Sequence, residues 1–133
     1  MLSIGNQTSA WATPLTLPFE YALANGFDAF EWFPDKKPGA GWDESDLDKT
    51  QRAKIRDAAA QSGVRLSVHA RWQANPLQPE SYPFFNTDLE LAKDLGAVLL
   101  NIHLHHEAGL PTFVKAITPL LDRAAAAGLR VSI

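Results

Sequence analysis

The sequence predicts an α/β fold in which helices and short strands alternate along one parallel sheet for about four and a half βα repeats. Two observations predict it. First, four segments share one order of features: a helical stretch, a glycine at its end and a short β-rich run. Their glycines, Gly26, Gly63, Gly96 and Gly128, are spaced by 37, 33 and 32 residues, and glycine readily takes the left-handed conformation that ends a helix. Second, connections from helix to strand are minimal, whereas those from strand to helix are long, which is typical of βα units.

The repeat places the elements in order. We expect strands at residues 2–6, 28–32, 65–69, 98–103 and from 129 onward, and helices at 18–25, 47–61, 85–95 and 112–127. Each strand after the first is the β-rich run that follows a repeat glycine. The first helix begins with Pro18, a residue favoured in a first helical turn, and the second ends before Gly63. Apolar residues of the third, such as Phe85 and Leu89, share one face. In the fourth, Pro119 predicts a kink or a split, because proline removes a backbone hydrogen bond.

Composition limits the classes of function. The 133 residues suffice for a single domain, 1–133, with a real core. The net charge of −3 offers no basic footprint, so we expect no nucleic-acid partner. Cysteine is absent, so any metal must be held by His, Asp or Glu. The start lacks a basic region with a long apolar stretch, and the longest apolar run is too short to span a bilayer. We therefore expect a cytoplasmic protein without a membrane partner.

Tryptophan and histidine gather in one kind of connection. The residues in the long strand-to-helix connections, or at the strand ends that lead into them, are Trp11, Trp32, Trp42, Trp72, His69, His103, His105 and His106. In a parallel α/β fold these connections meet on one face, outside the carboxyl ends of the strands, where ligands bind. Aromatic residues of a core would be scattered along helices and strands instead. The asymmetry therefore indicates a functional face.

His69 and His103 each close a predicted strand, at equivalent places in neighbouring repeats. Two imidazoles so placed can coordinate a divalent metal or transfer protons near neutral pH. The alternative is that each is a polar strand-end residue bonded to the backbone. Two in register favour function, so we take both as candidate catalytic and metal-binding residues. His105 is a weaker candidate for substrate binding, since residues just past a strand end are often merely solvated.

Other polar and aromatic residues complete the candidate site. Glu31 lies among apolar neighbours in "FDAFEWF" and would need a partner if it pointed into a core, so we take it as a catalytic candidate. Asn6 is a candidate for substrate binding on similar grounds. Trp32 and Trp72 offer flat apolar walls that suit the C–H faces of a sugar, although they could instead pack the loops onto the core. Arg71 could meet a phosphate or carboxylate, or be an ordinary surface charge.

The segments "GFDAFEWF", "GVRLSVHARW", "LAKDLGAVLLNIHLHH" and "LDRAAAAGLRVSI" follow one another through the chain. In this order they resemble the second to fifth strands of the xylose isomerase-like TIM barrels, a group that includes sugar-phosphate isomerases and epimerases and endonuclease IV. The resemblance implies a partial (β/α)8 barrel. It also implies a divalent metal (Mn, Mg, Co or Zn) held by strand-end residues, with His69 and His103 at matching positions and Glu31 at a commonly acidic one.

Two departures from the family pattern matter. Leu104 stands where many relatives have proline after the histidine, and the sequence reaches Ile133 where the fifth-strand glutamate would come next. At about 33 residues per unit, eight units need roughly 250 residues. We therefore expect the N-terminal half of a barrel, which would associate as a homo-oligomer through its open edges.

The resemblance implies a metal-dependent isomerase or epimerase acting on a small sugar or sugar phosphate, with this chain alone inactive. An endonuclease IV-like phosphodiester hydrolase is one alternative, which the acidic balance disfavours. A non-catalytic half-barrel module is another.

Overall fold

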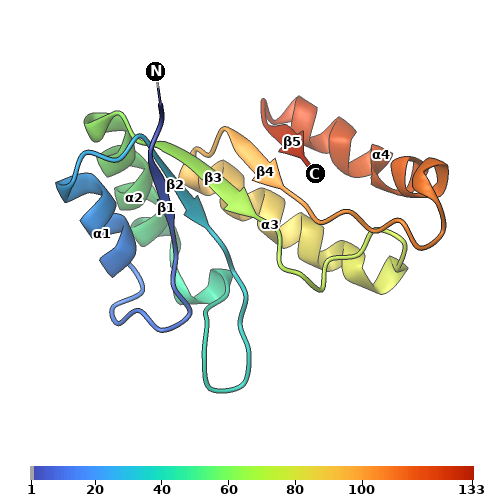
Figure 1. The fold of residues 1–133 in the computed structure, drawn as a ribbon, viewed down its shortest axis with the longest axis horizontal. Helices are drawn as coiled ribbons and strands as arrows, with labels where there is room; N and C mark the ends of the chain where they lie inside the picture. The colour runs from blue at the N-terminus through green and yellow to red at the C-terminus, as the bar shows by residue number, and fades with distance from the viewer. Residues whose placement is uncertain (1) are drawn as a thin grey trace.

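A computed structural model describes residues 2–133 as one parallel sheet in the strand order β1-β2-β3-β4-β5. The strands are β1 (Gly5–Gln7), β2 (Ala29–Trp32), β3 (Arg65–His69), β4 (Leu99–Asn101) and β5 (Arg130–Ser132). The helices are α1 (Leu17–Ala24), α2 (Lys49–Ser62), α3 (Tyr82–Leu95) and α4 (Leu110–Ala126), with short 3₁₀ helices η1 (Glu44–Asp46) and η2 (Pro79–Ser81). Each strand pairs with the next along the chain (Figure 1), and this is the predicted partial barrel.

The sheet has two unlike faces, because neighbouring side chains on a strand point to opposite sides. Buried apolar residues occupy the face that the helices cover, where Phe30 lies level with Leu66, and Val68 with Leu100. The opposite face is only partly buried and carries polar side chains. Glu31 of β2 lies level with Ser67 of β3. His69, Asn101 and Ser132 lie level with one another across β3, β4 and β5. In a barrel this second face points to the axis.

Two of the four repeat glycines are helix C-caps as predicted, whereas Gly26 and Gly128 lie one residue beyond the caps of α1 and α4. Gly63 and Gly96 cap α2 and α3 with φ of 70° and 65°, in the left-handed region. At the start of α2, Asp48 accepts a 2.8 Å hydrogen bond from the Gln51 backbone, and Gln51 Oε1 accepts one from the Asp48 backbone. This reciprocal pair satisfies two backbone donors that the first turn leaves free. The helix bounds therefore follow from short-range chemistry.

The expected split at Pro119 does not occur. Helix α4 runs without interruption from Leu110 to Ala126, with Pro119 inside it. Its apolar face, including Phe113 and Ile117, is buried against the sheet. Burial of this face stabilises the helix by more than the hydrogen bond that proline removes. Proline alone was therefore a poor predictor of a break here.

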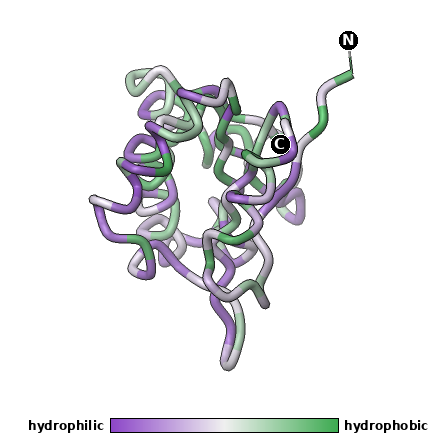
Figure 2. Tube along the Cα trace, turned by 90° about the vertical axis from the view of Figure 1, so that its left-hand side faces the viewer, coloured by the Kyte–Doolittle hydropathy of each residue, from purple (hydrophilic) through white to green (hydrophobic). Residues whose placement is uncertain are grey.

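Two strands, β1 and β4, differ most from their expected bounds, and β2 and β5 each begin one residue later than expected. Strand β1 begins at Gly5 instead of residue 2, and Leu2 and Ile4 are exposed. The chain start projects away from the rest of the molecule (Figure 2). Strand β4 ends at Asn101, so His103 lies just beyond the strand. Among residues 2–133, no helix is long and apolar enough to cross a membrane.

Candidate functional site

A chain of hydrogen bonds crosses the polar face of the sheet. Glu31 Oε1 accepts a 3.2 Å hydrogen bond from Ser67 Oγ and a second one from the Asn101 amide. The side-chain oxygen of Asn101, Oδ1, in turn accepts a hydrogen bond from Ser132 Oγ. The four side chains come from β2, β3, β4 and β5, which hold them in register. Hydrogen bonds from Ser67 and Asn101 to Oε1 therefore hold the Glu31 carboxylate in place on the polar face of the sheet.

The structure brings His69 and His103 together at the carboxyl ends of β3 and β4. Their ring centroids lie 4.7 Å apart, with an angle of 56° between the rings. His69 Nδ1 lies 2.8 Å from the Ala70 carbonyl oxygen. A carbonyl can only accept, so Nδ1 carries the proton and Nε2 keeps its lone pair. That is how a metal-binding histidine is commonly oriented, and it is equally the backbone-bonded arrangement of an ordinary strand-end histidine.

His103 is held in its neutral form. Burial lowers the pKa of His103 below its usual value, the neighbouring His69 and His105 lower it further, and Asp35 opposes them. The Nε2 atoms of His103 and His105 are buried and have no hydrogen-bond partner within the described residues. Neutral imidazole with an available nitrogen is the form that binds a metal or accepts a proton. The local electrostatics therefore suit either role.

A groove of about 470 Å³ opens beside the histidines, between the connections that follow β1 and β2. Phe33 lines it, and the Phe33 ring lies 4.6 Å from the His69 ring. The other lining residues are Asn6, Gln7, Thr8, Ser9, Ala10, Trp11, Asp35, Gly41 and Trp42. Amides, hydroxyls, a carboxylate and aromatic rings are the mixture that a polar ligand with apolar C–H faces needs.

Asn6 lies at this groove, but its place on the sheet differs from that of Glu31. It is in register with the buried Phe30, whereas Gln7 is level with Glu31. The Asn6 side-chain oxygen accepts a 2.8 Å hydrogen bond from the Gln7 backbone. Sequence reasoning did not single out Gln7, because an exposed glutamine in a short edge strand carries no pattern.

Trp32 requires a correction, since it does not line the site. Its side chain is fully buried, and the ring packs against Phe19, Phe30 and Trp42 at centroid distances of 5.5, 5.1 and 5.7 Å. The reason is the pleat: Trp32 follows Glu31 directly and so points to the opposite, helix-covered face. Trp72, in contrast, is 54% exposed in the connection after β3.

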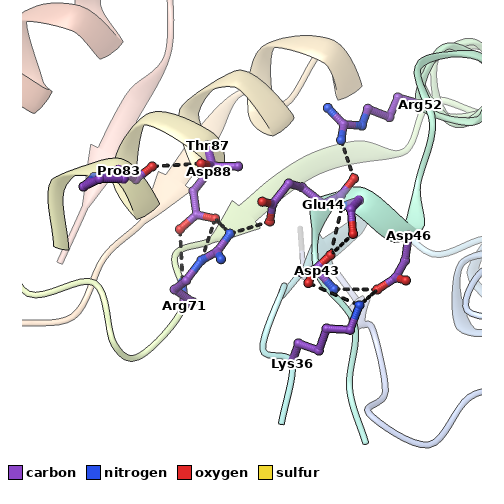
Figure 3. A network of polar contacts seen from close by, with 10 residues as sticks. Lys36, Asp43, Glu44, Asp46, Arg52, Arg71, Pro83, Thr87 and Asp88 are labelled. Carbon is purple, nitrogen blue, oxygen red and sulfur yellow. Dashed lines mark hydrogen bonds and ion pairs between the residues drawn. The ribbon is translucent and has the colours of Figure 1, made fainter. Parts of the chain in front are cut away.

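Arg71 also needs correction, because its guanidinium is already occupied. Arg71 Nη2 lies 2.8 Å from Asp88 Oδ1 and 2.6 Å from Glu44 Oε2 (Figure 3), and the group stacks 5.0 Å from the centre of the Phe84 ring. It is not a free cation for a substrate phosphate. Sequence reasoning missed Asp88, although a signal existed: Asp88 falls beside Leu89 on the apolar face of α3, where a carboxylate needs a partner.

The remaining candidates lie at the edge of the site. His105 Nδ1 is 3.6 Å from Glu107 Oε1, and the His105 ring centroid is 6.5 Å from that of His103. Lys36 pairs with Asp43 and Asp46, at 3.2 and 2.9 Å. The charges around the groove are therefore mostly paired within the chain.

A divalent metal fits this site in part. His69 and His103 supply two imidazoles, and His103 Nε2, which has no hydrogen-bond partner within residues 2–133, is a ligand atom of the right kind. Residues 2–133 hold no group of three His, Asp or Glu side chains arranged to bind a metal. These residues can thus supply two ligands, and a full coordination shell needs others.

Comparisons with known proteins agree with this geometry. A family model described as "xylose isomerase-like TIM barrel" matches residues 19–133. No curated protein sequence matches the chain. A D-psicose 3-epimerase, solved in the presence of D-fructose, superposes with a TM-score of 0.71 at 18% identity, over 98% of this chain and 51% of that one. A xylose isomerase domain protein from Planctomyces limnophilus gives 0.68 at 14% identity, over 96% and 52%.

A xylose isomerase domain-containing protein from Salmonella typhimurium likewise gives a TM-score of 0.68 at 20% identity, over 98% of this chain and 50% of that one. The chain thus spans about half the length of these solved structures. At such identities the likeness shows the fold, while the family model covers most of the chain. The chain therefore belongs to the family of xylose isomerase-like TIM barrels.

Proposed function

We propose that this chain forms the first half of a (β/α)8 barrel and carries part of the active site of a metal-dependent isomerase or epimerase for a small sugar or sugar phosphate. The observation that carries the proposal is the pair of imidazoles, His69 and His103, with ring centroids 4.7 Å apart at neighbouring strand ends. Glu31 lies on the same polar face of the sheet. Catalytic groups in TIM barrels sit at this end of the strands.

Each residue has a distinct part in this proposal. His69 and His103 would be two metal ligands, and the bound metal would polarise a substrate carbonyl or hydroxyl. Glu31, held through Oε1 by Ser67 and Asn101, would use its other oxygen to bind a substrate hydroxyl or to move a proton on the adjacent carbon. Further ligands would come from the other half of the barrel.

The surrounding charges support a sugar over a nucleic acid. Lys36, Lys37 and Arg71 all form ion pairs with carboxylates of the chain, at 2.6–3.2 Å. A phosphodiester hydrolase would present such cations to the backbone of its substrate. The groove instead offers amides, hydroxyls and aromatic rings, which match a polyhydroxylated ligand.

The test is sugar isomer formation, with Mn²⁺ or Co²⁺, by a complete barrel in which this chain is joined to the other half, since this chain alone supplies only part of the site. A panel of ketoses and aldoses that includes D-fructose would be incubated and the products separated by chromatography. We expect a metal-dependent product, lost in His69→Ala, His103→Ala and Glu31→Gln and retained in His106→Ala, because His106 is an exposed neighbour outside the pair. No product from any sugar, together with metal binding that ignores both His69 and His103, would reject the proposal.

A further inference from the structure

A buried carboxylate is hydrogen-bonded to the connection that follows His69. Asp88 on α3 is fully buried, and within residues 2–133 both of its oxygens accept hydrogen bonds from Arg71. Asp88 Oδ2 accepts a hydrogen bond from the Arg71 backbone N–H at 3.3 Å, and Oδ1 accepts from Nε at 3.3 Å and Nη2 at 2.8 Å. The carboxylate thus binds both the main chain and the side chain of Arg71. Such a contact fixes where the backbone runs, besides neutralising a charge.

The Arg71 guanidinium also binds the connection between β2 and α2. Glu44 in η1, between β2 and α2, accepts a 2.6 Å hydrogen bond from Arg71 Nη2. Glu44 is itself held, because its carbonyl oxygen accepts a hydrogen bond from Arg52 of α2 (Figure 3). Arg71 therefore joins α3 and two strand-to-helix connections at the face where the candidate site lies. These residues, Glu44, Arg71 and Asp88, are called the clamp below.

The clamp acts two residues from His69. Between them, the Ala70 N–H donates a 2.8 Å hydrogen bond to the Asn101 carbonyl oxygen, and the Ala70 carbonyl accepts from His69 Nδ1 at 2.8 Å. The orientation of the Ala70 carbonyl thus sets which imidazole nitrogen carries the proton. Arg71 directly follows Ala70, so the contacts that hold Arg71 lie next to this peptide.

Burial raises the pKa of Asp88 from its ordinary value to about 6, against the opposing effect of Arg71. A buried carboxylate whose surroundings oppose ionisation lowers the stability of the folded protein when it is ionised. Perturbed groups of this kind cluster near functional sites, and this one pairs with Arg71, two residues along the chain from His69.

We propose that Arg71 is a positioning residue: held by Asp88 and Glu44, it fixes the connection after β3 and thereby the tautomer and orientation of the His69 imidazole. The role of the clamp in turnover rests on the proposed function, whereas its effect on His69 does not. Arg71 itself would make no contact with substrate.

The test compares Arg71→Lys, which keeps the charge but loses the planar fork, with Asp88→Asn and with the double variant. Lys93→Gln is the matched control, since Lys93 forms an exposed ion pair with Glu90 on the same helix. ¹H–¹⁵N spectra of the histidine side chains report the His69 tautomer, and calorimetry with Zn²⁺ alone reports metal affinity. Steady-state kinetics on any sugar that is turned over separate kcat from KM.

We expect both single variants to lose the Nδ1–H form of His69 and to weaken Zn²⁺ binding about tenfold, as for other groups that orient metal-binding histidines. The double variant should be no weaker than either single one, because both break the same contact. The control should change nothing, and kcat should fall while KM stays within about twofold.

A rise in KM for Arg71→Lys alone, with unchanged His69 spectra, would make Arg71 a substrate contact and overturn the proposal. Lower melting temperatures with unchanged His69 spectra would also overturn it, since the clamp would then be only structural. If Arg71→Lys does not fold, Glu44→Gln, which keeps the Arg71–Asp88 pair, is judged by the same spectra. Absence of sugar turnover in the wild-type complete barrel would reject the proposed function while leaving the His69 result intact.

Discussion

Replacing Asp88 by asparagine should change how the stability of the protein depends on pH. In the folded state burial raises the Asp88 pKa to about 6, whereas its ordinary value, which applies in the unfolded chain, is 3.8. Between these values the unfolded chain has lost the proton and the folded chain still holds it, so folding stability falls as pH rises. A difference of about two pKa units at about 1.4 kcal/mol each amounts to about 3 kcal/mol. The wild type should therefore lose about 3 kcal/mol relative to Asp88→Asn between pH 4 and pH 6, with no further change above.

Urea unfolding at a series of pH values from 4 to 7.5, followed by circular dichroism, measures the difference. Asp94→Asn is the matched control, because Asp94 lies on the same helix and ion-pairs with Arg52 at 2.7 Å. Burial works to raise the Asp94 pKa, but hydrogen bonds from Arg52 and Lys49 leave it lowered. Its stabilising effect is therefore lost only as pH falls below about 4, so the control difference should be flat across the window. A wild type that gains stability over Asp88→Asn as pH rises would refute the reasoning, because the Arg71 pair would then outweigh burial.

Three further predictions follow from the fold. Calorimetry should show only weak Zn²⁺ binding to this chain, because two imidazoles do not complete a coordination shell. Either His69→Ala or His103→Ala should reduce that binding. Submicromolar binding that survives the double replacement would place the site elsewhere. Trp32→Ala should cost about 3–5 kcal/mol of unfolding free energy, and Trp72→Ala less than about 1, since only the first ring is buried; equal losses in denaturant melts would contradict this packing. Strands β1 and β5 lie at the sheet edges, so light scattering should detect a homodimer or larger assembly, and a stable monomer at micromolar concentration would contradict that expectation.

The sequence by itself determined the alternation of helices and strands and where they meet. Gly63 and Gly96 end α2 and α3 through a property of the glycine backbone. The reciprocal contact of Asp48 and Gln51 starts α2 within one turn. Because the strands are parallel, their carboxyl ends share an edge, so His69 and His103 could be expected to lie near each other. These features depend on interactions between residues close in the chain, or on the direction of the strands.

Only the tertiary structure decided which face each side chain occupies and what it meets there. Trp32 and Glu31 are adjacent, yet one is buried under helices and the other faces the barrel axis. The pairing of Arg71 with Asp88 joins residues 17 positions apart, and that with Glu44 joins residues 27 apart. Such contacts depend on how α3 packs against the sheet, and a one-residue change of register would exchange the two faces of a strand. Side-chain partners at this distance are set by packing, which no local pattern of residue types encodes.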